Sequence, residues 1–261
     1  MSRSRADKSS DQESEGKNAR KKSPGRKRKK SKPKKRSRLF HAFKWLFILG
    51  FVLAAIPVVL SLIYMHPSVH PVSTLMLGRM VTGQTVERNW VPLSDIDIDL
   101  KHAVVMSEDG QFCNHRGIDW RELNQVIDNA LEGERTRGAS TITMQLAKNL
   151  FLWPGRSYVR KALEVPLAVM IDALWSKKRI LEIYLNVVEW GDGVFGIDAA
   201  MKNYFNGTAS RVNVRQAALL AVTLPSPATR NPAKPRRSDQ RRAKRVQRLA
   251  RVASRYSRCL K

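Results

Sequence analysis

The sequence predicts a mostly α-helical domain preceded by one transmembrane helix. Trp45–Met65 holds 21 residues without a charged side chain, about the length that a helix needs to cross the hydrocarbon core of a membrane. Between residues 99 and 224, apolar side chains recur at spacings of three and four, the period of amphipathic helices. Strands and helices do not alternate along this stretch, so a parallel α/β fold is not expected.

The first 38 residues are predicted to be a disordered basic tail. The stretch KKSPGRKRKKSKPKKRSR is nearly free of apolar residues, so it cannot bury enough surface to fold. The tail leads into a transmembrane helix at residues 39–65, inside which Pro57 is tolerated. No small-residue cleavage site follows, which argues against a cleaved signal peptide. By the positive-inside rule, the tail stays in the cytoplasm and the chain after Met65 lies outside.

The formal charge of +26 comes from the two ends of the chain. Residues 1–44 contain 18 basic and 4 acidic residues, and residues 230–261 contain 13 basic and 1 acidic residue. The remaining residues 45–229 contain 17 of each and are neutral. A neutral domain outside the membrane is not expected to bind nucleic acid, and the basic tail is better explained by attraction to anionic membrane lipids.

The outer domain is predicted to begin with a loop-rich segment and to continue as a series of helices. Residues 132–140 are polar and are expected to form a loop. Ser140 or Thr141 is expected to cap the next helix, which Pro154-Gly155 ends. The expected helices span residues 99–108, 119–131, 141–151, 157–175, 177–186, 197–205 and 214–224.

Several common catalytic motifs are missing from the outer domain. The Ser-x-x-Lys motif of acyl-transfer sites occurs only at Ser14 and Ser31, in the tail, where no site would be preorganised. The sequence contains neither a zinc-type Cys/His spacing nor a Gly-Lys-Ser phosphate loop. Cys113 and Cys259 lie in an oxidising compartment if the cell is a bacterium with an envelope, and the sequence allows them to pair or to stay free.

Two polar clusters of the outer domain have the composition of a catalytic site. Glu108-Asp109 follows the apolar run AVVM, although an isolated acidic pair is usually a helix cap or solvated. Four cations fall within fourteen residues, with Glu164 close behind them. They form either a solvated basic face or a cradle for phosphate or pyrophosphate. The cations are Lys148, Arg156, Arg160 and Lys161.

Five segments of the chain match, in order, the motifs of one family. They are Glu108-Asp109 with Phe112, His115 and Gly117 (ED-x-x-F-x-x-H-x-G), Gly138–Gln145 (G-x-S-T-I-T-x-Q), Arg160–Glu164 (R-K-x-x-E), Lys177–Asn186 (K-x-x-I-L-E-x-Y-L-N) and EWGDGVFGIDAA. In these residues the chain resembles the peptidoglycan glycosyltransferases, glycosyltransferase family 51, in their one-domain, monofunctional form. The resemblance covers about residues 90–231, and five ordered motifs are far more specific than any one of them.

The resemblance implies a lysozyme-like α-helical domain at residues 66–231 that polymerises lipid II, the undecaprenyl-pyrophosphate-linked disaccharide-pentapeptide. Glu108 would be the general base that takes the proton from the 4-hydroxyl of the acceptor sugar. That hydroxyl would attack the anomeric carbon of the donor with inversion. The neighbouring apolar run would raise the pKa of Glu108 by desolvation, toward the value that such a base needs.

The remaining site residues are carried over from the matching motifs. Glu164 would be the second catalytic acid, positioning the cation cluster or a divalent ion, Mg²⁺ or Mn²⁺, whose ligands the motifs do not identify. No organic cofactor is implied. The implied substrate-binding residues are Ser140, Thr141, Gln145, Lys148, Asn149, Arg156, Arg160 and Lys161. The implied structural residues near the site are Asp109, Phe112, His115, Gly117 and Gly138.

Some features depart from the family pattern or lie outside it. Met144 and Ala139 stand where many relatives carry Gln and Gly. Pro166 interrupts the predicted helix at 157–175, either bending it so that Glu164 faces the cleft or as a neutral kink. Residues 232–261 are predicted to be a basic C-terminal extension, with an interfacial helix on anionic lipid as one interpretation.

The resemblance also implies a location and partners. The protein would span the inner membrane of a bacterium once, with its catalytic domain in the periplasm. Its partners would be lipid II, the growing glycan strand, membrane lipids and other wall-synthesis or division proteins.

Two other functions stay open on the residues alone. A lysozyme-like glycan hydrolase would need a general acid and would shorten glycan, and the cation cluster argues against it because a hydrolase has no pyrophosphate to hold. A non-catalytic membrane-anchored scaffold would not need Glu108.

Overall fold

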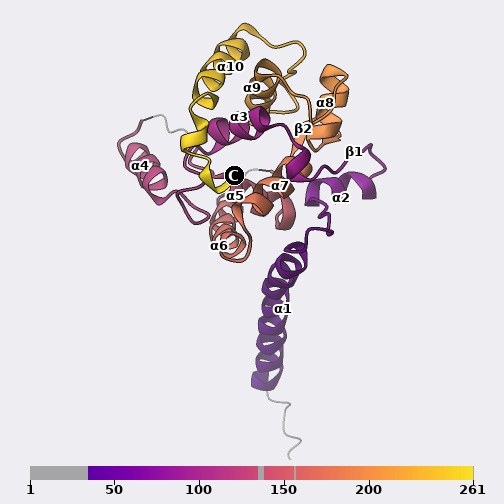
Figure 1. The fold of residues 1–261 in the computed structure, drawn as a ribbon. Coiled ribbons are helices and arrows are strands. Elements are labelled where there is room, and N and C mark those ends of the chain that lie inside the picture. Colours follow the sequence, from indigo (N-terminus) through magenta and orange to yellow (C-terminus); the bar gives the residue numbers. More distant parts are fainter. Residues whose placement is uncertain (1–34, 135–137, 156, 261) are drawn as a thin grey trace, which may run out of the picture. The chain divides into compact units, whose positions relative to one another are not determined.

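The structure is a computed structural model that describes residues 35–134, 138–155 and 157–260. It divides into two compact units, one up to Phe47 and one from Ile48 onward. Most of the tail predicted at residues 1–38 lies outside the described residues, as do Arg156 and part of the predicted loop at 132–140. Figure 1 shows the helices of the second unit.

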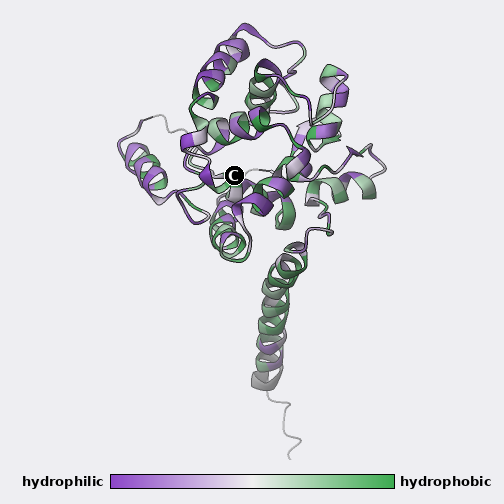
Figure 2. Ribbon diagram, viewed as in Figure 1, coloured by the Kyte–Doolittle hydropathy of each residue, from purple (hydrophilic) through white to green (hydrophobic). Residues whose placement is uncertain are grey.

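Helix α1, Lys35–Tyr64, contains the predicted membrane helix. Within the described chain it is the one helix long and apolar enough to cross a membrane, over the 25 residues Phe40–Tyr64. Its apolar side chains are exposed, as a surface that faces lipid requires, and Figure 2 shows hydrophobic residues along its length. Pro57 lies inside the helix without ending it. The prediction of one candidate transmembrane helix is therefore confirmed.

The end of α1 is fastened to the helical domain by hydrogen bonds to its backbone. The indole Nε1 of Trp175 donates to the carbonyl oxygen of Ser61 at 2.8 Å. The buried guanidinium of Arg179, on α7, donates to four carbonyl oxygens at and just beyond the end of the helix. These belong to Tyr64, His66, Pro67 and Val69, at 3.0, 2.9, 3.5 and 2.6 Å. The last carbonyls of a helix have no partner within it, so Arg179 satisfies groups that would otherwise need water.

Two groups of helices build the domain, which confirms the mostly α-helical class (Figure 1). In one group, α3 packs against α9 and α10, which also pack against each other. In the other, α5 packs against α6 and α7. The bounds are α3 Ile98–Glu108, α9 Val214–Thr223, α10 Arg237–Ala250, α5 Ile142–Phe151, α6 Tyr158–Leu174 and α7 Lys177–Val187.

Further helices, turns and short strands surround the two groups in the described chain. The helices are α2 Thr74–Val81, α4 Trp120–Leu131 and α8 Ile197–Phe205, with 3₁₀ turns η1 Leu93–Asp95, η2 Ala253–Arg255 and η3 Arg258–Leu260. Three short strands, β1 Glu87–Arg88, β2 Glu189–Gly191 and β3 Val194–Phe195, form a sheet in the order β1-β3-β2. Strand β1 runs parallel to β3, and β2 runs antiparallel to it. The sequence did not predict this sheet.

Helix starts coincide with capping side chains. The hydroxyl oxygen of Thr141 accepts from the N–H of Met144 at 3.1 Å, as predicted for the start of α5. Asp119 caps α4 in the same way, Ser157 caps α6 and Asn213 caps α9. Such caps satisfy backbone N–H groups that the first turn leaves free. They explain why these helices begin within a residue or two of the predicted positions.

Gly117 lies where the loop after α3 touches α6. Its φ is +82°, and a Cβ atom placed there would lie 2.6 Å from the carbonyl oxygen of Ala168. We expect Gly117→Ala to lower the free energy of unfolding by about 2–4 kcal/mol, because it adds backbone strain to a clash with rigid backbone. Denaturant unfolding in detergent measures this. Gly78→Ala in α2, with open space around it, is the control, and equal effects of the two variants would contradict the expectation.

Candidate active site

Glu108 is the last residue of α3 and lines a cleft of about 710 Å³. Both groups of helices contribute to this cleft, which has walls from the end of α3, from α5, from α9 and from α10. Gly138, Ser140 and Gln145 of the predicted site also line it. The carboxyl group that the sequence singled out therefore lies at an opening large enough for part of a sugar substrate.

Hydrogen bonds orient the Glu108 carboxylate. The side-chain Nε2 of Gln145 donates to Oε2 of Glu108 at 3.1 Å, and the Ser107 hydroxyl donates to Oε1 at 3.3 Å. The hydroxyl of Tyr184, which is fully buried, donates to Oε1 of Gln145 at 3.0 Å. Because the Gln145 amide oxygen is engaged by Tyr184, its NH₂ group faces Glu108. In the sequence Tyr184 was only one residue of the Lys177–Asn186 motif, so its role in orienting Gln145 was not predicted.

Burial raises the pKa of Glu108 above its ordinary value. The hydrogen bonds from Gln145 and Ser107 and the positive charge of Arg230 oppose this shift, while the nearby charge of Asp109 adds to it. Desolvation is the largest cause, as the apolar run before Glu108 led us to expect. A carboxyl group with a raised pKa can accept a proton near neutral pH.

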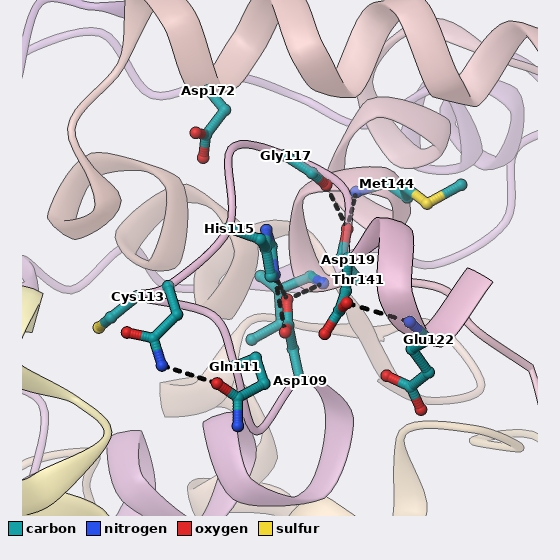
Figure 3. A network of polar contacts seen from close by, with 12 residues as sticks. Asp109, Gln111, Cys113, His115, Gly117, Asp119, Glu122, Thr141, Met144 and Asp172 are labelled. Carbon is teal, nitrogen blue, oxygen red and sulfur yellow. Dashed lines mark hydrogen bonds and ion pairs between the residues drawn. The ribbon is translucent and has the colours of Figure 1, made fainter. Parts of the chain in front are cut away.

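Asp109 also lines the cleft, and its carboxylate fixes the loop that follows α3 (Figure 3). Its carboxylate accepts from Nε2 of His115 at 2.9 and 3.0 Å and from the N–H of Ile142 at 3.0 Å. The Thr141 hydroxyl donates to the carbonyl oxygen of Gly117 at 2.6 Å. These bonds hold the loop against the N-terminus of α5, where a carboxylate is also favoured by the helix dipole. The two adjacent acids thus have separate hydrogen-bond partners: Glu108 is held by Gln145 and Ser107, and the buried Asp109 by His115 and the start of α5.

Phe112 belongs to the same loop and is fully buried in the core. The ammonium group of Lys177 lies 4.7 Å from the centroid of its ring and pairs with Asp172. This contact adds a cation–π interaction to the burial of the ring.

Glu164, Arg160 and Lys161 form an ion-pair cluster on α6, which Ser140 joins through a hydrogen bond. Glu164 and Arg160 are both buried, and their side chains form an ion pair one turn apart on α6. Lys161 reaches the other carboxylate oxygen of Glu164 at 2.9 Å and also donates to the Ser140 hydroxyl. Both oxygens of Glu164 are therefore engaged by cations, and α6 continues through Pro166 to Leu174.

Lys148 interacts electrostatically with this cluster from α5. Burial lowers the pKa of Lys148, the charge of Glu164 opposes that shift, and the charges of Arg160 and Lys161 reinforce it. Asn149 follows on the same helix, and its backbone carbonyl accepts from the Thr74 hydroxyl at 3.2 Å. Arg156, predicted to join these cations, lies outside the described residues.

Helix α10 forms a wall of the cleft that the sequence did not indicate. Arg242 and Arg245 line the cleft with Val246 and Leu249, and Arg230 lines it from the segment before α10. We predicted a separate basic extension from residue 232, but α10 packs on α3 and α9 within the same compact unit. Figure 2 shows how hydrophilic α10 is, and such a composition does not distinguish a cleft wall from a lipid-facing helix.

Cys113 and Cys259 form a disulfide, with their Cα atoms 5.6 Å apart. The sequence left this pairing open. The bond joins the loop after Asp109 to η3, near the end of the chain.

The described residues do not make a metal site by themselves. Residues 35–134, 138–155 and 157–260 contain no group of three or more His, Cys, Asp or Glu side chains that could hold an ion. Glu164, the acid predicted to position a divalent ion, already pairs with two cations. Magnesium is often bound by one or two carboxylates together with substrate phosphates, so an ion here would need ligands from the substrate.

Comparison with known proteins assigns the family. A family model described as Transglycosylase matches residues 75–251, which is more than half of the chain. The chain therefore belongs to the transglycosylase family, and the match extends through α10.

Curated relatives define the enzyme class. Over 210 residues the chain is 56% identical to the biosynthetic peptidoglycan transglycosylase of Brucella suis biovar 1 (strain 1330), covering 80% of this chain and 94% of the relative. Over 208 residues it is 54% identical to the protein of the same name in Agrobacterium fabrum (strain C58 / ATCC 33970), covering 80% and 92%. The protein is a peptidoglycan glycosyltransferase, as its motifs implied, and this class replaces the hydrolase and scaffold alternatives.

Proposed function

We propose that the protein polymerises lipid II into β-1,4-linked glycan by an inverting mechanism with Glu108 as general base. One observation carries the proposal: the half-buried Glu108 lies at the cleft with its carboxylate held by Gln145, near a cation cluster in which Arg160 is buried and Lys148 and Lys161 are half-buried. A base and an anion-binding cluster are the two parts that transfer from a sugar pyrophosphate needs.

In the proposed reaction Glu108 removes the proton of the acceptor 4-hydroxyl while that oxygen bonds to the anomeric carbon of the donor. The bond between this carbon and the pyrophosphate oxygen breaks, and its electron pair leaves with undecaprenyl pyrophosphate. A single displacement inverts the anomeric centre, so an α-linked donor gives a β-linked product. The proton stays on Glu108 until it passes to solvent.

The leaving group is a pyrophosphate, so it needs charge stabilisation more than protonation. We propose that Lys148, Arg160 and Lys161 supply it, with Arg156 added from the family motif, while Glu164 holds Arg160 and Lys161 in place. Ser140, Gln145 and Asn149 would bind the sugar and phosphate groups beside them, and Thr141 and Gly138 would shape that wall. A divalent ion, Mg²⁺ or Mn²⁺, that arrives with the pyrophosphate would add positive charge there.

Membrane anchoring follows from the candidate span. We propose that the protein spans the inner membrane once, with the basic tail in the cytoplasm and the catalytic domain in the periplasm. Lipid II and the growing strand would reach the cleft from the outer leaflet. Other wall-synthesis or division proteins are the proposed partners.

The proposal is tested with detergent-purified full-length protein, labelled lipid II and Mg²⁺. Lysozyme-sensitive polymer, resolved by size, is the expected product. A parallel reaction with EDTA measures the contribution of the divalent ion. Intact lipid II after incubation with folded protein and added Mg²⁺ or Mn²⁺ would overturn the proposal.

The pH dependence of kcat/KM is expected to report the raised pKa of Glu108. The base works only as a carboxylate, so activity should fall as the pH is lowered through a pKa above the ordinary glutamate value of 4.5. Arg230 lowers this pKa through its positive charge. Arg230→Gln should therefore shift the acid limb to higher pH than in the wild type. An unchanged limb, or one shifted to lower pH, would contradict this assignment.

A further inference from the structure

The last part of the chain lies on the helix that carries Glu108. Helix α10 packs on α3, the turn η2 also packs on α3, and η3 packs on α7. We call residues 237–260, which include these three elements, the C-terminal strap. Its cleft side presents Arg242 and Arg245 to the opening that Glu108 lines. The position of the strap therefore sets the position of one cleft wall.

Few side chains hold the strap against the domain. Three of the residues of α10 are buried, and of the residues after it only two are buried in the described chain. They are Asp239, Ala243, Val246, Ala253 and Ser257. Small side chains contribute little apolar area, and hydrophobic stabilisation is proportional to the area removed from water. After α10, the partly buried Cys259 and Leu260 also pack against the core, so the end of the strap depends on few apolar contacts.

The charges of α10 also oppose close packing. The helix contains six basic residues and one acidic residue, a net charge of +5. Arg237, Arg241 and Arg245 follow one another at spacings of four, where like charges on a helix repel. Asp239 offsets part of this charge, at 3.6 Å from both Arg230 and Arg242. The basic side chains are exposed to solvent, so they add no attraction between the helix and the domain, and a further constraint would fix its position.

The Cys113–Cys259 disulfide supplies that constraint. Cys113 lies in the loop that Asp109, His115 and the start of α5 hold in place, so its end of the bond is fixed. Cys259 lies at the far end of the strap, and its N–H also points at the sulfur of Cys113, 3.3 Å away. The bond therefore ties the end of the strap covalently to the loop after α3, across a sequence separation of 146 residues.

We propose that this disulfide positions the strap as the substrate-binding wall of the cleft, so that affinity for the lipid-linked substrate depends on the oxidation state of Cys113 and Cys259. The substrate part of this proposal rests on the proposed function. A dithiol or phosphine reductant gives two electrons to the sulfur–sulfur bond, which breaks to leave two thiols after uptake of two protons. The strap then keeps only its weak packing, and Arg242 and Arg245 move relative to Glu108.

The test compares four forms of the full-length protein in detergent: oxidised wild type, wild type treated with reductant, and the double variant Cys113→Ser/Cys259→Ser with and without reductant. Thiol labelling confirms each redox state. We expect KM for lipid II to rise roughly tenfold in the three forms without the disulfide, the effect of losing about one charge-assisted hydrogen bond, while kcat changes little. Reductant should have no effect on the double variant.

Two readouts separate positioning from a general loss of folding. A smaller folded fraction lowers kcat and leaves KM unchanged, whereas a displaced wall raises KM. Amide hydrogen exchange over residues 237–250 should accelerate on reduction, with α9 unchanged. Equal KM values and equal exchange in all four forms would overturn the proposal. If oxidised wild type makes no polymer, the proposed function fails, and the exchange measurement still decides whether the disulfide holds the strap.

Discussion

Glu108→Gln is expected to lower the rate of glycan polymerisation about 10³-fold, because a positioned general base contributes on the order of 10²–10⁴ to such a transfer. Glutamine keeps the volume of the side chain, and its amide oxygen can still accept the hydrogen bond from Gln145. The substitution therefore removes the ability to take a proton and little else. Initial rates with labelled lipid II measure the effect. Glu132→Gln, on an exposed residue at the end of α4, is the matched control.

The stability of the Glu108→Gln variant provides a second check. Burial raises the pKa of Glu108 in the folded protein, so folding disfavours its carboxylate. Glu108 therefore adds its full contribution to the free energy of unfolding when the pH is below its pKa in the unfolded chain. That contribution is lost as the pH rises through its pKa in the folded protein. Glutamine carries no charge, so the variant should melt at the same temperature as the wild type or higher at neutral pH. A fully active variant, or an inactive one that melts much lower, would contradict the assignment of Glu108 as the base.

Lys148→Met is expected to lower kcat by about 10²–10³, because a preorganised charge that stabilises a leaving group contributes this much. Methionine fills a similar volume without the ammonium group. Burial lowers the pKa of Lys148, so folding disfavours its charge, and removal of the charge should not reduce stability at neutral pH. Single-turnover rates with lipid II measure the loss without a contribution from product release.

The comparison variants for Lys148 test charge separately from position. Lys148→Arg keeps a cation and should retain more activity than Lys148→Met, although its planar group fits a different geometry. Lys202→Met, on an exposed residue of α8, should leave the rate unchanged. Equal rates for Lys148→Met and the wild type would remove Lys148 from the proposed pyrophosphate site.

Capping side chains in the sequence made the starts of helices predictable. Thr141 and Asp119 cap helices where the sequence offered a side chain for this purpose, so the starts of α5 and α4 could be placed to within about a residue. The short strands were not predicted, because two or three residues are too few to show the alternation of apolar and polar side chains that indicates a strand.

The two acids illustrate what the sequence could and could not specify. The apolar run before Glu108 predicted its desolvation, and the raised pKa agrees with this. The contacts that orient that carboxylate were not predictable, because Gln145 reaches Glu108 across 37 positions of the chain and Tyr184 reaches Gln145 across 39. Contacts at such separations depend on how helices pack, which hydrophobic spacing alone does not determine.

The C-terminal segment was the least predictable part of the cleft. Its arginines repeat in a pattern that suits solvent, anionic lipid or a binding wall equally well, and only packing distinguishes them. Ala243 and Val246 face the core, but two apolar residues are too few to predict a buried helix face from the sequence. The disulfide was undetermined for a related reason, since two cysteines far apart carry no information about their distance in space.

Helix α7 carries two contacts that serve different parts of the protein. Arg179, near its start, binds the carbonyls at the end of the membrane span, and Tyr184, less than two turns later, orients Gln145 beside Glu108. One short helix therefore holds both the backbone at the end of the candidate span and the side chain that orients Gln145. A substitution that shifts α7 is expected to disturb both contacts at once.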